Sequence, residues 1–145
     1  MNFMEFIIFV ENLKQQHPIW FGLDSDKPPS IDDIQATEEK LGIKFPNDYL
    51  DFVNEFGGGY FAFSNIYSLE KESDWNILDR NLKYANIRKN YILVSENGAG
   101  DFYGFKAENG VCKPQIHFYD HDEGSWQETE ISNIFEYLKE LALSN

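Results

Sequence analysis

The chain has 145 residues and a formal net charge of −13, from 25 acidic and 12 basic side chains. That length is typical of a single domain. Aromatic residues make up 17% of the chain, and they can supply a large core that a disordered chain would lack. The negative charge argues against binding to nucleic acid or anionic membranes and favours basic partners. Acidity can also serve only to keep an aromatic-rich chain in solution.

The single cysteine, Cys112, excludes an internal disulfide and a cysteine metal cluster. The apolar run Phe6–Val10 is too short for the core of a signal peptide, and Glu5 and Glu11 bracket it. Because the sequence has neither a disulfide framework nor a leader or transmembrane stretch, we expect a cytoplasmic protein.

Residues 1–29 predict a helix followed by a loop. The helix, Asn2–Gln16, carries one apolar stripe formed by Phe3, Phe6, Ile7, Val10 and Leu13. Three prolines then mark residues 18–29 as loop: Pro18, Pro28 and Pro29. We interpret residues 1–29 as an extension of a core at 30–141 within one domain, 1–145.

Residues 30–56 predict two helices in succession. Ser30 and Asp33 form a capping box at the start of the first helix. Gly42 follows Leu41, where a left-handed C-terminal cap is expected. Pro46 then suits the first turn of a second helix, whose apolar stripe is Tyr49, Phe52, Val53 and Phe56.

Three glycines follow this second helix at 57–59. They end the helix and allow a sharp turn into the next strand. We therefore expect a positive φ at Gly57 or Gly58, directly after the helix.

The remaining chain alternates short strands with two helices. A hairpin is expected over Tyr60–Phe63 and Ile66–Leu69 with its turn at Ser64-Asn65. A helix from about Trp75 to Tyr84, capped by Ser73 or Asp74, should turn Trp75, Leu78 and Leu82 inward. Further strands are expected at Tyr91–Ser95, Asp101–Lys106, Val111–Cys112, Gln115–Tyr119 and Trp126–Thr129, and a last helix from Ser132 to Leu143.

This order of elements predicts an α+β fold. Hairpin-linked strands favour one twisted antiparallel sheet, possibly mixed, of about five or six strands with flanking helices. Pro114 should mark a bend or an edge, because proline cannot donate to a sheet ladder.

The chain resembles the SUKH superfamily of immunity proteins, which includes yeast cell-wall-assembly regulators. The first matching motif runs through Glu38, Leu41, Gly42, Pro46, Asp48, Tyr49, Phe52, Val53, Gly57 and Gly58. Phe56 departs from the pattern, where the family usually has Asn. Weaker matches follow at Ile92–Tyr103, with Gly100 and Asp101, at Asp120–Glu123 and at Phe135–Leu138.

The resemblance implies a SUKH-like fold and an intracellular immunity protein that binds and neutralises a cognate toxin. The toxins met by this family are often nucleases, whose cationic substrate groove would complement an acidic protein. The resemblance also implies a non-catalytic protein with no cofactor, and we expect a monomer or weak homodimer. The alternative is a scaffold or regulatory domain of a signalling or cell-wall pathway.

The acidic run Asp120–Glu123 is the only cluster that invites a metal or acid–base interpretation. Four consecutive positions rarely point at one centre, so a solvated acidic loop is the favoured interpretation. An enzyme using Asp101 together with these carboxylates would require a deep pocket that joins them. We therefore predict no catalytic, cofactor or metal-binding residues.

Two acidic segments are better candidates for a protein-binding surface. The first contains Glu70, Glu72 and Asp74, and the second contains Asp120, Asp122 and Glu123, with Trp126 just beyond. Charge speeds encounter and a buried ring supplies affinity. These seven residues are our predicted partner-binding site, beside the alternative that the loops are merely polar.

Overall fold

The computed structural model describes residues 1–144. Its elements, in chain order, are α1 (Phe3–Gln16), the 3-10 turn η1 (Pro18–Phe21), α2 (Ile31–Leu41), α3 (Asn47–Phe56), β1 (Gly59–Phe61), β2 (Ser64–Ile66), α4 (Ile77–Lys83), α5 (Ala85–Arg88), β3 (Tyr91–Glu96), β4 (Phe102–Glu108), β5 (Val111–Asp120), β6 (Ser125–Glu128) and α6 (Ile134–Leu141). None of the helices within residues 1–144 is long and apolar enough to cross a membrane.

The predicted α+β class is confirmed. Strands β3 to β6 form one antiparallel sheet in chain order, while β1 and β2 form a separate two-stranded hairpin. The strands are thus split between two sheets, where we expected one of five or six strands. The hairpin lies beside β3 and is joined to it through Asn65, whose side chain bonds the backbone of Glu96, and through Tyr67 N–H, which donates to Val94 O.

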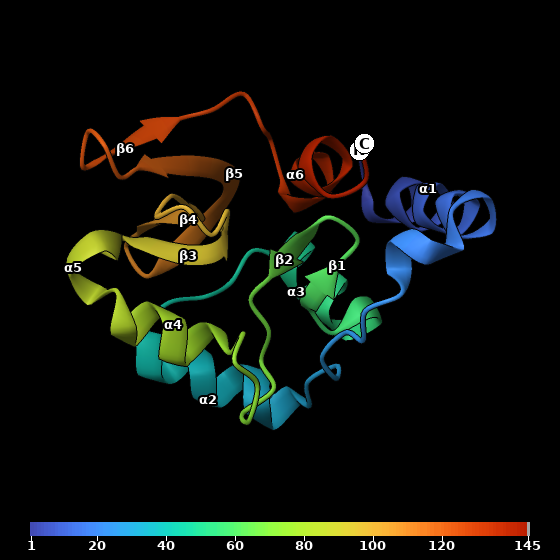
Figure 1. The fold of residues 1–145 in the computed structure, drawn as a ribbon. Coiled ribbons are helices and arrows are strands. Elements are labelled where there is room, and N and C mark those ends of the chain that lie inside the picture. Colours follow the sequence, from blue (N-terminus) through green and yellow to red (C-terminus); the bar gives the residue numbers. More distant parts are fainter. Residues whose placement is uncertain (145) are drawn as a thin grey trace.

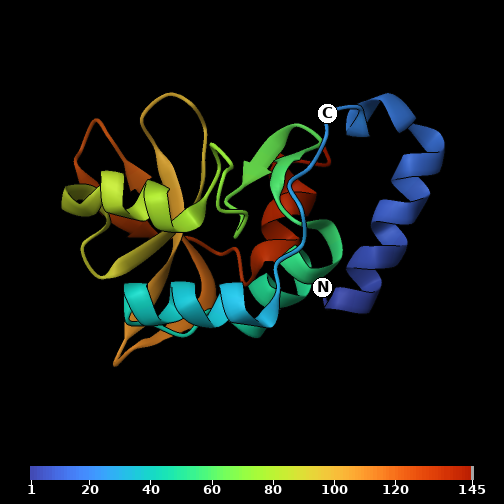
Figure 2. The ribbon, with the colours of Figure 1, turned by 90° about the horizontal axis from the view of Figure 1, so that it is seen from below.

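Helices α3 and α6 lie against one face of the four-stranded sheet, and α4 runs beside its β3 edge (Figures 1 and 2). On one face, Tyr103 packs against Tyr137 of α6, and Phe105 against Tyr49 of α3. On the other face, Phe102 packs against Tyr84, between α4 and α5. This division follows from the alternation of side chains along β4.

The N-terminal helix α1 lies at one end of the molecule, next to α6 and the hairpin (Figure 1). Asn2 and Glu5 form a capping box at its start. Phe6 is fully buried, and its ring centroid lies 5.0 Å from that of Phe135 and 6.1 Å from that of Phe61. Residues 18–21, predicted as loop, form the 3-10 turn η1.

The motif residues of α2 and α3 hold the linker between these two helices in place. Gly42 has φ 69° and caps α2 in the left-handed conformation, as predicted. The buried Glu38 accepts a hydrogen bond from Phe45 N–H at 2.8 Å, so its carboxylate satisfies the linker backbone. Pro46 is the N-cap of α3, and Tyr49 Oη donates to Tyr67 O at 2.6 Å.

The glycine run after α3 combines positive φ angles with close backbone packing. Gly57 and Gly58 have φ 82° and 107°, which confirms the expected turn. The segment around Asp26 crosses directly over this run, and Asp26 N–H donates to Gly58 O at 2.8 Å. A Cβ on Gly57 would lie 1.7 Å from Asp26 O, so only glycine fits there.

Several element boundaries differ from the sequence predictions. The hairpin turns at Ala62-Phe63, where Ala62 has φ 50°, because Asn65 is recruited to bond β3. Helix α4 is capped by Asn76, and α6 is capped by Asn133 instead of Ser132. A short helix, α5, was not predicted.

Strand β5 is continuous through Pro114, although its pairing with β4 is irregular there. The register passes from the pair Phe105 and Ile116 to the pair Ala107 and Cys112, so the β5 side contains extra residues around the proline. The ladder is therefore irregular at Pro114, where we expected a bend or an edge.

Candidate functional site: the acidic turn and its Asp101–His121 clasp

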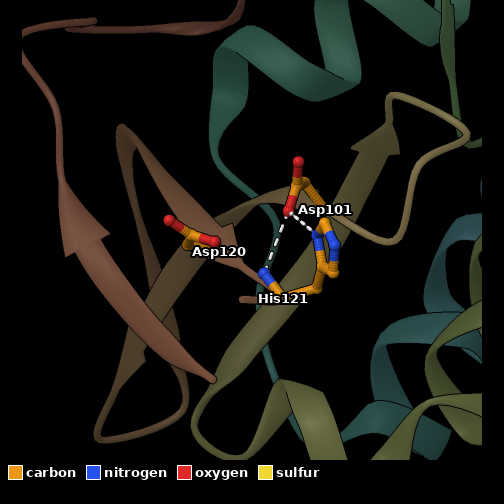
Figure 3. Close-up of side chains that lie close together, drawn as sticks. All are labelled: Asp101, Asp120 and His121. Carbon is orange, nitrogen blue, oxygen red and sulfur yellow. Dashed lines mark hydrogen bonds and ion pairs between the residues drawn. The ribbon is translucent and has the colours of Figure 1, made fainter. Parts of the chain in front are cut away.

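The turn between β5 and β6 is tied to the turn between β3 and β4 by one carboxylate. Asp101 Oδ1 accepts hydrogen bonds from the backbone N–H of His121 at 2.9 Å and from its Nδ1 at 2.6 Å. Figure 3 shows both bonds converging on one oxygen, with Asp120 beside the pair. We call this pair the Asp101–His121 clasp.

The β3–β4 turn is built to present Asp101. Asn97 Oδ1 accepts from Ala99 N–H and Asp101 N–H, and Asn97 Nδ2 donates to Asp101 Oδ2 at 2.8 Å. Gly100 has φ 97°, and a Cβ there would lie 3.2 Å from His121 Cγ. The predicted Gly100-Asp101 motif therefore acts by bringing the two turns together.

The clasp shifts the titration of both of its members. The backbone N–H of His121, followed by its ring N–H, lowers the pKa of Asp101 to about 2. In turn, the hydrogen bond to Asp101 raises the pKa of His121 above its ordinary value. Both shifts favour the ionised pair, since each charged group is hydrogen-bonded to the other.

Asp101, Asp120 and His121 offer three ligand atoms within 4.8 Å of one another. Two ligands of one tetrahedral zinc lie about 3.3 Å apart, given metal–ligand distances of about 2.0 Å. Asp101 Oδ1 and His121 Nδ1, at 2.6 Å, are closer than that and are bonded directly to each other. His121 is 46% exposed, so the group lies at the surface and not in the deep pocket that acid–base chemistry would require. The Asp101–His121 pair therefore acts as a structural link between the β3–β4 and β5–β6 turns.

The predicted acidic residues 120–123 lie in the β5–β6 turn, which the Asp101–His121 clasp holds in place. Asp120 Oδ1 accepts from Asp122 N–H at 2.9 Å, and Glu123 accepts from Gln127 Nε2 at 2.9 Å. The Asp122 side chain is 84% exposed. The turn therefore offers carboxylates to solvent on a backbone that its own hydrogen bonds hold in place.

Trp126 is more deeply packed than a free anchor would be. Its ring stacks on that of Tyr91 with centroids 4.2 Å apart, and its Nε1 donates to Ile87 O at 2.9 Å. It also covers Gly104, where an added Cβ would meet the ring at 3.1 Å. Only part of the indole remains open to a partner.

The first predicted acidic segment, Glu70 to Asp74, lies in the loop between β2 and α4. Asp26 fixes this loop, since its Oδ2 accepts from Ser68 Oγ and Ser73 Oγ. Lys71 lies 3.9 Å from Asp33. Sequence reasoning missed Asp26 because its partners lie more than forty positions away along the chain.

The structure keeps the two acidic segments apart. The β2–α4 loop lies beside α2, whereas the β5–β6 turn lies at the far edge of the sheet (Figures 1 and 2). The predicted seven residues therefore form two separate acidic surfaces, and Trp126 belongs to the second.

The fold and its clasped turns define an α+β domain whose motif residues hold loops and turns in place. The SUKH_6 family model, described as SMI1-KNR4 cell-wall, matches residues 31–138. The chain belongs to this family, and the predicted resemblance is confirmed. No curated protein matches the chain.

Proposed function

We propose that this protein is an immunity protein that binds and neutralises a cognate toxin, of nuclease type, in the cytoplasm. The observation that carries the proposal is the clasped acidic turn at Asp120–Glu123 in a chain of net charge −13. A rigid acidic surface complements the cationic groove that a nuclease needs for its substrate. Neutralisation then requires no chemistry from this chain, only occupation of the toxin's surface.

Rigidity favours this function because an ordered turn loses little conformational entropy when it binds. The clasp, the Asp120–Asp122 bond and the Glu123–Gln127 bond together fix the acidic turn before any partner arrives. We assign long-range attraction to Asp120, Asp122 and Glu123, and short-range contact to the open part of Trp126. Glu70, Glu72 and Asp74 add to the attraction from a second side.

The test is survival of a bacterial host that expresses the toxin domain encoded next to this protein. Growth should be restored by the wild-type chain, and the two proteins should co-purify as a complex. A variant with Asp120, Asp122 and Glu123 replaced by lysine keeps the Asp101–His121 clasp but loses the acidic charges and the bonds of Asp120 and Glu123, and it should weaken rescue. A toxin that stays lethal in the presence of soluble, folded protein would contradict the proposal.

The second candidate is a scaffold or regulator in a signalling or cell-wall pathway. The description of the matching family as SMI1-KNR4 cell-wall favours it. In that case the neighbouring genes should encode enzymes or regulators instead of a toxin. Affinity capture should then yield pathway components, with no effect on toxin lethality.

A further inference from the structure

A cleft of about 340 Å³ opens between the β1–β2 hairpin, the β3–β4 turn and α6. Its walls include Phe63, Trp75, Tyr103 and Leu141. Phe63 and Leu141 are 49% and 41% exposed, so apolar groups face solvent inside a hollow. Such a volume is within the range of about 300–1,000 Å³ typical of ligand pockets.

A carboxylate with one unused oxygen lies in the same cleft. Glu96 Oε1 accepts hydrogen bonds from Tyr67 Oη at 2.8 Å and from Arg80 Nη1 at 2.7 Å. Within residues 1–144, no protein group donates to Glu96 Oε2. The Glu96 side chain is 17% exposed, so this oxygen is an acceptor in a partly desolvated setting, where a charge-assisted bond is strong.

The guanidinium of Arg80 already lies against Glu96 and two aromatic rings. Its Cζ lies 5.0 Å from the ring centroid of Trp75 and 5.6 Å from that of Tyr67, while its Nη1 donates to Glu96 Oε1. Aromatic rings and a carboxylate thus already bind one cation by cation–π and ionic contacts. The cleft exposes further rings, Phe63 and Tyr103, around the same carboxylate.

Charge also favours a cationic occupant, although Glu96 already pairs with Arg80. Burial, and then the charge of Asp101, raise the pKa of Tyr103, so a carboxylate lies near this wall of the cleft. The chain as a whole carries −13. A positively charged occupant is therefore favoured over a neutral or acidic one.

We propose that this cleft binds an arginine or lysine side chain presented by a basic protein partner. The side chain would lie among Phe63, Trp75 and Tyr103, with its charged group on Glu96 Oε2. The partner would be the toxin, so the use of this site rests on the proposed function, while its chemistry does not. The acidic loops would attract the partner, and the cleft would anchor it.

The chemistry is tested by NMR titration of the full chain with acetyl-Gly-Arg-Gly-amide. Signals of Phe63, Trp75, Tyr103 and Leu141 should shift together on binding. The same peptide with citrulline, which has the shape of arginine without its charge, should bind about tenfold more weakly. Phe63→Ala should weaken binding of the arginine peptide about threefold to tenfold.

Two leucine variants form a matched pair. Leu141→Arg places a cation in the cleft and should abolish binding of the arginine peptide. Leu82→Arg makes the same change at an exposed position (58%) of α4 that does not line the cleft, and it should bind like the wild type. Shifts confined to the acidic loops, equal binding of the citrulline peptide, or equal losses in both variants would overturn the proposal.

The toxin domain separates this inference from the proposed function. If it binds wild type and Leu141→Arg with equal affinity, the cleft is not the anchor and the immunity function stands. If it does not bind wild type while the arginine peptide fills the cleft, the immunity function is wrong and the cationic site stands. Tight toxin binding that Leu141→Arg weakens and Leu82→Arg preserves supports both.

Discussion

At the scale of single residues, Phe52 lies at the centre of the aromatic core. It is fully buried, and its ring centroid lies 5.2 Å from those of both Phe56 and Phe61. Phe52→Ala should lower the free energy of unfolding by about 3–5 kcal/mol, because the rigid neighbours cannot fill the space. Urea denaturation measures this. Phe63→Ala, at a ring that is 49% exposed, is the control and should cost far less.

The Asp101–His121 clasp makes a pH-dependent contribution to stability. The raised pKa of His121 means that its share is complete below about pH 6.5 and is lost as pH rises through the folded value. The share of Asp101 is present above about pH 4 and is lost as pH falls through its folded pKa of about 2.

Asp101→Asn should therefore destabilise the protein more at pH 5.5 than at pH 8.5. It should also lower the pKa of His121, because the ring loses its anionic partner. NMR titration of the His121 ring signals and urea denaturation at both pH values measure these effects. A His121 titration that is the same in both proteins would show that the clasp does not form in solution.

The glycine run after α3 shows, at the element scale, what a single Cβ would displace. Gly57→Ala would combine left-handed strain of about 1–2 kcal/mol with a clash against Asp26 O at 1.7 Å. The control is Gly98→Ala, at φ 77° with no atom within 4 Å of the added Cβ. Gly57→Ala should cost roughly 1–3 kcal/mol more than the control in urea. Faster hydrogen exchange at Asp26 N–H should accompany it.

Equal costs for the two alanine substitutions would mean that the segment at Asp26 moves aside easily. In that case the glycine run would serve only to turn the chain. Hydrogen exchange at Asp26 N–H distinguishes the two roles, because this group donates to Gly58 O only while the crossing is intact.

Elements with strong local signals could be predicted from the sequence. The capping box at Ser30, the cap at Gly42 and the stripe of α3 depend on neighbours within two turns of helix. In α4 the same reasoning failed, since Leu82 is 58% exposed and Asn81 is fully buried. The Asn81 amide bonds both N–H and C=O of Leu93, a partner that helical periodicity cannot reveal.

The division into two sheets could not be predicted for a similar reason. Asn65 reads as a turn residue in sequence, but its side chain bonds Ser95 and the backbone of Glu96 and so replaces a ladder between β2 and β3. The sequence identified the acidic residues of both segments as candidates. It did not reveal the clasp that holds the β5–β6 turn, because this clasp joins Asp101 to a residue twenty positions away. Long-range polar pairs leave no periodic signal.

At the scale of the whole molecule, the effect of the net charge of −13 on a basic partner depends on where the carboxylates lie. The β2–α4 loop and the β5–β6 turn lie at separate places on the surface (Figures 1 and 2). A basic partner approaching the turn would meet its charges at close range and those of the loop from farther away. Since the Debye length is about 8 Å at physiological salt, the nearer set should dominate the encounter.

Two charge reversals of equal size test this. One replaces Asp120, Asp122 and Glu123 by lysine, and the other replaces Glu70, Glu72 and Asp74. With the toxin domain immobilised, the first should slow association several-fold and the second less, while both leave dissociation nearly unchanged. Raising the salt concentration should shrink both effects, because screening shortens the range of the field. Association rates that ignore salt and all six reversals would show that the charge serves solubility alone, and binding would then depend on the aromatic surfaces.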